Sequence, residues 1–221
     1  ILLSRLMGAT TILEGSGYST AVKATWENAL EQVRRDGGKP YAIPAGASDH
    51  PLGGLGYANF ADEVAAQERE QSVFFDTIVT ASCTGSTQAG MVVGFAAQDR
   101  PRRIIGVDTA ADAAMTRQAV GKIAQATADL VGLRRAIGQG DIVIDPRFAG
   151  PGYGLPDAAT IEAIRMAARL EGMITDPVYE GKSMAALIAM ARSGEIPSGS
   201  TVLYVHLGGG PAVNAYCRAF E

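Results

Sequence analysis

The chain has 221 residues, 47% of them hydrophobic, and a net charge of −4, which indicates a globular protein able to bury a sizeable core. It has no stripe of basic residues for a nucleic acid and no apolar run long enough to cross a membrane. Cys83 and Cys217 form no C-x-x-C motif, so we expect no disulfide framework and a reducing, cytoplasmic location. His50 and His206 lie far apart in sequence, so a zinc site has little support.

The first residues, 1–8, have the apolar spacing of an amphipathic helix and do not start with an initiator methionine. Because a natural chain rarely starts inside a helix, we expect these residues to belong to the C-terminal part of a longer chain. Gly8 is expected to end this helix. After it, residues 10–13, 19–35 and 39–44 predict a strand, a helix with a basic C-terminal end and a second strand, which together form a β-α-β block.

A loop rich in glycine and proline follows at residues 44–56, and a loop of this length usually crosses between domains or contributes to a site. Beyond it, helical and strand patterns alternate, which predicts βαβ units and a parallel sheet. The expected strands are 75–79, 103–108, 141–145 and a buried last strand at 201–207. The expected helices are 59–70, 88–93, 110–131 (in two pieces if Gly121 interrupts it), 157–170 with Asp157 as its cap, one that ends at 192, and a last helix after 211.

The loop between the strand at 75–79 and the next helix has the composition of an anion site. The first-turn N–H groups of a helix point outward, and the helix dipole favours negative charge there. Gly85 lets the backbone approach a ligand, while Thr84, Ser86 and Thr87 add hydroxyl donors. An ordinary turn capped by Ser or Thr explains the loop alone equally well. No G-x-x-x-x-G-K-[ST] or G-x-G-x-x-G motif is present, so the loop predicts a phosphorylated cofactor.

Three loops are expected beyond the carboxyl ends of the strands, where a doubly wound sheet binds its ligand: 83–87, 178–183 and 207–210. Together they offer a phosphate loop, an acid and aromatic hydroxyls. This combination suggests a pyridoxal phosphate enzyme with the fold of the tryptophan synthase β subunit.

Four long motifs then identify a specific resemblance. TGSTQAGMVVGFAA, RFAGPGYGLP, EGMITDPVYEGKSM and HLGGGPAVNAY closely resemble the 1-aminocyclopropane-1-carboxylate (ACC) deaminase family, and the match runs along the whole chain. The resemblance implies an α/β fold of the type II pyridoxal phosphate enzymes, with two open, twisted, mostly parallel sheet domains. Residues 1–48 would be the remainder of the small domain, and 49–221 the large cofactor-binding domain without its N-terminal segment.

The resemblance also implies an activity. The family opens the ring of ACC and deaminates it to 2-oxobutanoate and ammonia, as a hydrolase that acts on C–N bonds with pyridoxal 5'-phosphate. Its members are cytoplasmic homo-oligomers, so we expect a homodimer or a larger assembly, with ACC as the small-molecule partner.

Cofactor-binding roles follow position by position from the resemblance. Thr84, Gly85, Ser86 and Thr87 would hold the phosphate, and Glu180 would face the pyridine nitrogen. A carboxylate there favours the protonated ring, which is the better electron sink. Without the resemblance, Glu180 reads as an acid in the first turn of a helix, worth a few tenths to about 1 kcal/mol.

The resemblance also implies catalytic roles for two tyrosines. Tyr179, or alternatively Tyr153, would act as nucleophile or acid/base, and Leu207 would form an apolar wall of the substrate pocket. A tyrosine of pKa about 10 is a poor base at neutral pH. The positive charge of the cofactor, or a second tyrosine hydroxyl, would have to lower that pKa. Without the resemblance, each tyrosine reads as a residue that packs and hydrogen-bonds in a loop.

Two rival interpretations remain. D-Cysteine desulfhydrases share the fold but carry a hydroxyl residue at the position of Glu180 and threonine at that of Leu207, so both positions favour the deaminase. The family's Schiff-base lysine and its substrate-binding Ser–Asn pair precede the first residue of this chain. We therefore expect the 221 residues alone to be inactive, and a non-catalytic chain that binds phosphate or forms an oligomer interface is the third interpretation. The lysines outside the Schiff-base motif are Lys23, Lys39, Lys122 and Lys182.

Overall fold

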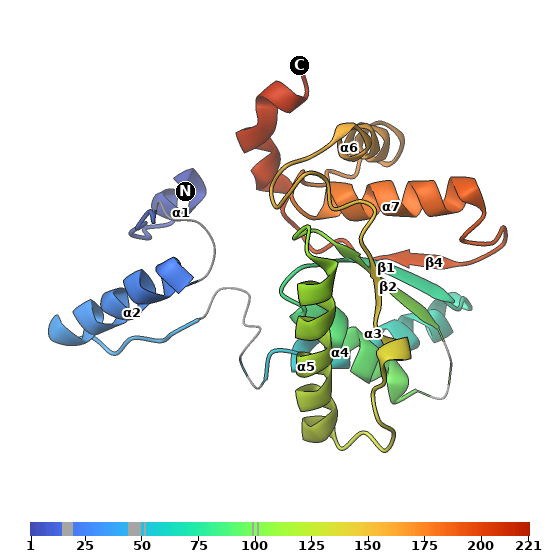
Figure 1. Ribbon diagram of the computed structural model, residues 1–221, viewed down its shortest axis with the longest axis horizontal. Helices are drawn as coiled ribbons and strands as arrows, with labels where there is room; N and C mark the ends of the chain where they lie inside the picture. The colour runs from blue at the N-terminus through green and yellow to red at the C-terminus, as the bar shows by residue number, and fades with distance from the viewer. Residues whose placement is uncertain (15–19, 44–49, 51, 99, 101) are drawn as a thin grey trace. The chain divides into compact units, whose positions relative to one another are not determined.

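The computed structural model describes residues 1–14, 20–43, 50, 52–98, 100 and 102–221 (Figure 1). The chain divides into two compact units, Ile1–Pro44 and Ala45–Glu221. The assignment of these units to a small and a large domain of an enzyme stays a prediction.

The smaller unit contains the two helices that the sequence predicts. α1 (Leu2–Leu6) ends just before Gly8, whose φ of +87° stops it, and it buries none of its residues. α2 (Thr20–Arg35) carries the expected basic residues in its last turn.

The two strands predicted at 10–13 and 39–44 are wrong for every described residue of these segments, and residue 44 lies outside the described part. A β-branched run becomes a strand only when a neighbouring strand satisfies its backbone N–H and C=O groups. Among the described residues of the smaller unit, no segment pairs with either run.

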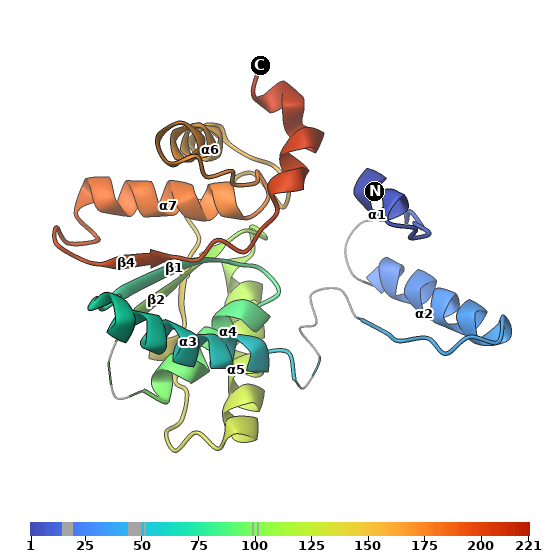
Figure 2. The same cartoon turned by 180° about the vertical axis from the view of Figure 1, so that it is seen from behind.

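The larger unit is built on a four-stranded sheet of order β3-β2-β1-β4, in which every pair is parallel (Figures 1 and 2). The strands are β1 (Thr77–Ser82), β2 (Arg103–Asp108), β3 (Val143–Asp145) and β4 (Val202–Tyr204). All of β1 and nearly all of β2 are buried, because helices cover both faces of a parallel sheet. The predicted α/β architecture is confirmed.

Helices pack on both faces of this sheet. α3, α4 and α5 cover one face, and α7 covers the other, with α6 packed on α7 (Figure 2). Alternate residues of the central strands pack against the two opposite helix layers. Ile78 packs against α3 and α4, whereas Val79 packs against α7. The helices are α3 (Leu55–Gln71), α4 (Ser86–Ala96), α5 (Ala113–Val131), α6 (Ala158–Glu171) and α7 (Glu180–Ser193), with 3-10 turns η1 (Gln139–Asp141) and η2 (Gly210–Ala219).

Several bounds in the larger unit differ from expectation, among them those of α3, β1 and β3. Gly121 does not interrupt α5, where it lies close to Ile142, and the helix starts only at Ala113 because Asp112 accepts a hydrogen bond from the N–H of Met115. β4 is shorter than 201–207 and only half buried, since among the described strands it pairs with β1 alone. The last helix is a 3-10 helix kinked at Tyr216. The cap predicted at Asp157 is confirmed.

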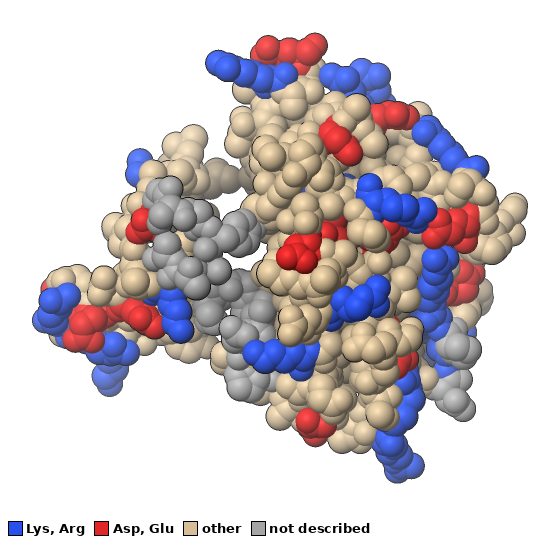
Figure 3. Space-filling model, viewed as in Figure 1, with Lys and Arg blue, Asp and Glu red and all other residues tan. Residues whose placement is uncertain are grey.

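On the face drawn in Figure 3, basic and acidic side chains are interspersed over the described surface of the larger unit. Among the described residues, no helix has the length and hydrophobicity needed to span a bilayer.

Candidate functional site

The carboxyl edge of the sheet brings the predicted loops together. β1 and β4 pair in parallel, so the loop after Ser82 and the loop after Tyr204 leave the sheet side by side. The N-terminus of α7 joins them, because the side chain of Glu180 accepts hydrogen bonds from the N–H groups of Leu207 and Gly208. Three segments far apart in sequence therefore meet at one edge.

The short loop after β1 ends in a left-handed glycine. Gly85 is the N-cap of α4 with φ +95°, and a Cβ there would lie 2.9 Å from the backbone nitrogen of Val120. The N-cap residue of this helix is therefore a glycine, which has no side chain to act as a cap. Ser86 and Thr87 lie half buried in the first turn of α4, and Thr84 is exposed. The loop thus offers backbone N–H groups and hydroxyls to an anion.

Glu180 is a buried acid, 1% exposed, at the start of α7. Its Oε1 accepts the N–H of Gly208 at 2.9 Å as well as that of Leu207. Burial raises the pKa of Glu180, while these two amides and His206 oppose that shift. The cap of α7 belongs instead to Asp176, whose carboxylate accepts three successive backbone N–H groups, those of Val178, Tyr179 and Glu180. Glu180 is therefore more than a first-turn acid, since its side chain fixes the loop after β4.

His206 faces the second oxygen of Glu180. Its Nδ1 lies 2.6 Å from Oε2, an atom with no well-aligned hydrogen bond to any described residue. Its Nε2 lies 3.2 Å from the carbonyl oxygen of Ile174. Nδ1 also accepts the N–H of Gly208 at 3.2 Å. His206 therefore links Glu180, the acid predicted to face the cofactor ring, to Ile174 and to its own loop.

The two predicted catalytic tyrosines meet. The hydroxyls of Tyr153 and Tyr179 are hydrogen-bonded to each other, and their rings pack edge to face with centroids 5.6 Å apart. Burial, followed by the contact with Tyr153, raises the pKa of Tyr179 far above its ordinary value. The expectation that a second tyrosine hydroxyl lowers this pKa is therefore wrong, because the hydrogen bond with Tyr153 raises the pKa of Tyr179. A lower pKa would have to come from a positive charge that binds beside them.

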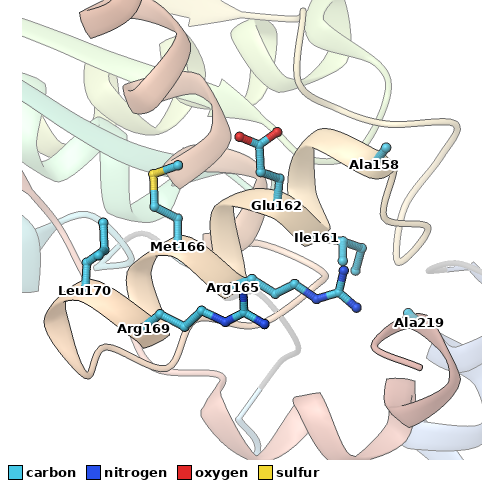
Figure 4. A pocket seen from close by; sticks show the side chains of 8 residues that line it. All are labelled: Ala158, Ile161, Glu162, Arg165, Met166, Arg169, Leu170 and Ala219. Atoms are coloured by element: carbon cyan, nitrogen blue, oxygen red, sulfur yellow. The ribbon is translucent and has the colours of Figure 1, made fainter.

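Leu207 contributes to the site through its backbone, and its side chain is 40% exposed. A surface hollow of about 580 Å³ lies elsewhere, along α6 (Figure 4). None of the predicted site residues lines this hollow, so its size does not indicate where the active site lies. Its lining residues are Ala158, Ile161, Glu162, Arg165, Met166, Arg169, Leu170 and Ala219.

Sequence reasoning missed three contributors to the site. Asp176 could have been found, because an acid followed by proline before a helix is a capping signal. His206 was weighed only as a metal ligand. Tyr204 read as an apolar strand residue, yet its hydroxyl donates to the carbonyl oxygen of Glu180 at 2.8 Å. The last two act through contacts between segments distant in sequence, which no local pattern encodes.

A parallel sheet whose carboxyl edge carries a loop at a helix N-terminus and a buried acid is typical of cofactor-binding α/β enzymes. The chain belongs to the pyridoxal-phosphate dependent enzyme family, which it matches over residues 1–208. Membership confirms the type II fold and the predicted cofactor class, pyridoxal 5'-phosphate.

Solved structures agree with this assignment. A crystal structure described as an ACC deaminase homologue is 30% identical with a TM-score of 0.86, and the match covers 99% of this chain and 64% of that one. An O-ureido-L-serine synthase matches at 16% identity and TM-score 0.64, over 96% of this chain and 62% of that one. An O-acetylserine sulfhydrylase from Entamoeba histolytica matches at 15% identity and TM-score 0.60, over 97% of this chain and 59% of that one. At these lower identities the likeness concerns the fold alone.

Proposed function

We propose that the complete protein is an ACC deaminase, which converts ACC and water to 2-oxobutanoate and ammonia. The observation that carries the proposal is the buried carboxylate of Glu180 at the carboxyl edge, fixed by two backbone amides. The 30% identity to an ACC deaminase homologue supports it. Because the chain spans 64% of that structure, activity, substrate and assembly are proposals for the whole protein.

The residues at the carboxyl edge fit pyridoxal phosphate. Gly85 leaves a cradle at the start of α4 that a Cβ would fill, and first-turn N–H groups with the hydroxyls of Thr84, Ser86 and Thr87 suit a phosphate. The Oε2 atom of Glu180 makes no well-aligned hydrogen bond with a described residue, although Nδ1 of His206 lies 2.6 Å away, so it would be able to pair with a ring nitrogen. When bound, the cofactor supplies an electron sink for the substrate carbon.

Glu180 keeps a proton next to the ring nitrogen. Its raised pKa favours a proton between Oε2 and any nitrogen that approaches it, and the two amides on Oε1 hold the carboxyl group in place. A hydroxyl residue at this position, as in the desulfhydrases, would hold that proton less firmly.

The tyrosine pair moves a proton at the substrate. Tyr179 acts as nucleophile or acid/base through its hydroxyl oxygen, and Tyr153 holds that hydroxyl by the hydrogen bond between them. The alternative is that Tyr153 is the nucleophile or acid/base and Tyr179 holds its hydroxyl. The side chain of Leu207 would form an apolar wall of the substrate pocket.

The lysine that binds the cofactor covalently is assigned to a part of the protein outside these residues, so the 221-residue chain alone is expected to be inactive. We further propose a cytoplasmic homodimer or larger homo-oligomer.

The test is substrate preference in the whole protein. We expect 2-oxobutanoate from ACC, little sulfide from D-cysteine, and a shift toward D-cysteine in the double variant Glu180→Ser, Leu207→Thr. The control is Glu162→Ser on the exposed face of α6, which should leave both rates unchanged. Preference for D-cysteine in the unmodified protein would replace the deaminase by the desulfhydrase, and an unchanged preference in the double variant would refute the role of these two positions.

A further inference from the structure

Lys182 is a buried lysine that the proposed chemistry does not use. Its side chain is fully buried, in the first turn of α7, two residues after Glu180. Burying a charged amine is costly unless its donors are satisfied. None of the described acidic residues forms an ion pair with it within 4.0 Å, so the charge is compensated in another way.

Three backbone carbonyl oxygens surround the nitrogen of Lys182. Nζ donates to Ala149 at 2.5 Å, to Gly152 at 2.9 Å and to Thr109 at 3.4 Å. A neutral amine has two N–H groups and a lone pair, and the lone pair would face a carbonyl oxygen, whereas an ammonium has three donors for three acceptors. Burial lowers the pKa of Lys182, but Asp157 and Asp108 oppose this shift. The cage is therefore built for the charged form.

The cage joins three parts of the site. Thr109 follows β2 and is itself bonded to Ser82, the last residue of β1, through its N–H and its hydroxyl. Ala149 and Gly152 belong to the loop before α6. At Gly150 this loop turns with φ +68°, and a Cβ there would lie 2.6 Å from the carbonyl oxygen of Leu155 and 3.6 Å from the Cε of Lys182. The loop therefore wraps around the head of the lysine.

Both tyrosines of the pair are attached to this cage. Tyr153 directly follows the acceptor Gly152, and Tyr179 lies one helical turn before Lys182 on the same element. Carbonyl cages of this kind replace the hydration shell of monovalent cations in other proteins. We propose that Lys182 is a positioning residue: its ammonium acts as a built-in monovalent cation that holds the Tyr153 loop against α7. The loop's link to catalysis rests on the proposed function, whereas the cage itself does not.

The test is chemical rescue of Lys182→Ala in the complete protein, read by hydrogen exchange of residues 149–155. We expect exchange in this loop to accelerate about tenfold or more. Methylammonium, which restores the missing charge in the vacated space, should reverse the change, and the bulky tetramethylammonium should not. Lys182→Met fills the space without the charge, so it should show the same acceleration and no rescue. Lys122→Ala, at an exposed lysine of α5, should change nothing.

Unchanged loop exchange in Lys182→Ala, or equal recovery of both variants with methylammonium, would overturn the proposal. If Lys182→Ala does not fold, nitrogen-15 NMR of the unmodified protein decides. A slowly exchanging NH₃⁺ signal from Lys182 at neutral pH supports the cage, and a neutral amine refutes it. None of these readouts depends on the substrate, so a failed deaminase assay leaves them interpretable.

Discussion

The two edges of the sheet hold buried charge in opposite ways. At the amino edge, before β1 and β2, Glu68 of α3 forms a buried ion pair with Arg102, each side chain being 1% exposed. Glu68 also accepts the N–H of Phe75, and the guanidinium of Arg102 stacks on the ring of Phe95. At this edge a buried negative charge is matched by a buried positive charge, although Nε of Arg102 makes no hydrogen bond with a described residue.

The carboxyl edge leaves its charges incompletely matched. Lys182 has neutral carbonyl partners, and Glu180 has two amides and a half-exposed histidine. Incomplete matching costs stability but leaves groups whose protons and charges a ligand can engage. We infer that the amino edge stabilises the fold and that the carboxyl edge binds the cofactor and substrate.

The largest expected effect is at the amino edge. Glu68→Ala leaves the guanidinium of Arg102 buried without its carboxylate, so we expect a loss of about 3–5 kcal/mol in the free energy of unfolding, measured with denaturant. As a control, Glu31→Ala removes the exposed pair with Arg34 and should cost less than about 1 kcal/mol. Similar losses in both variants would contradict the comparison.

Next in size is the loss of cofactor binding in Gly85→Ala. The new Cβ would meet the backbone of α5 and force a left-handed residue out of place, so we expect cofactor affinity to fall by about tenfold or more. Gly132→Ala is the matched control, since Gly132 is also left-handed, at φ +66°, but has open space around it. Gly132→Ala should lower the stability of the protein and leave its cofactor affinity unchanged. Equal binding by both variants in a cofactor titration would contradict the assignment of the phosphate to the Gly85 loop.

A smaller effect concerns pH. The folded-state pKa of Glu180 is raised above its ordinary 4.5, so the folded form without cofactor binds this proton more tightly than the unfolded form. The contribution of Glu180 to stability is therefore greatest below pH 4.5 and is lost as the pH rises through the raised pKa. Glu180→Gln cannot ionise, so its stability relative to the unmodified protein should increase with pH over this window. A difference that stays constant with pH, in unfolding curves of the two proteins, would contradict the assignment.

Sequence patterns predicted the parts of this structure that depend on local chemistry. β2 matches its predicted bounds because Ile104, Ile105 and Val107 form a buried run between charged ends, and α6 starts where Asp157 caps it. The strands predicted in the smaller unit are wrong because a strand depends on a partner that the run itself does not encode.

Motifs supplied the predicted site residues, whose roles stay predictions, but not the contacts between those residues. Lys182 reaches Thr109 across 73 positions, and Glu180 reaches Leu207 across 27. Such contacts exist only once the sheet has placed its loops at one edge, so neither the cage nor the histidine beside Glu180 could be derived from spacing. The raised pKa of Tyr179 has the same origin, because burial follows from packing.

A crystal structure of the complete protein with pyridoxal phosphate tests the account most directly. We expect the phosphate within hydrogen-bond distance of the N–H groups that follow Gly85, the ring nitrogen beside Glu180 and the covalent link on a lysine outside these residues. A phosphate bound away from the Gly85 loop, or a covalent link to Lys182, would contradict the assignment of the carboxyl edge.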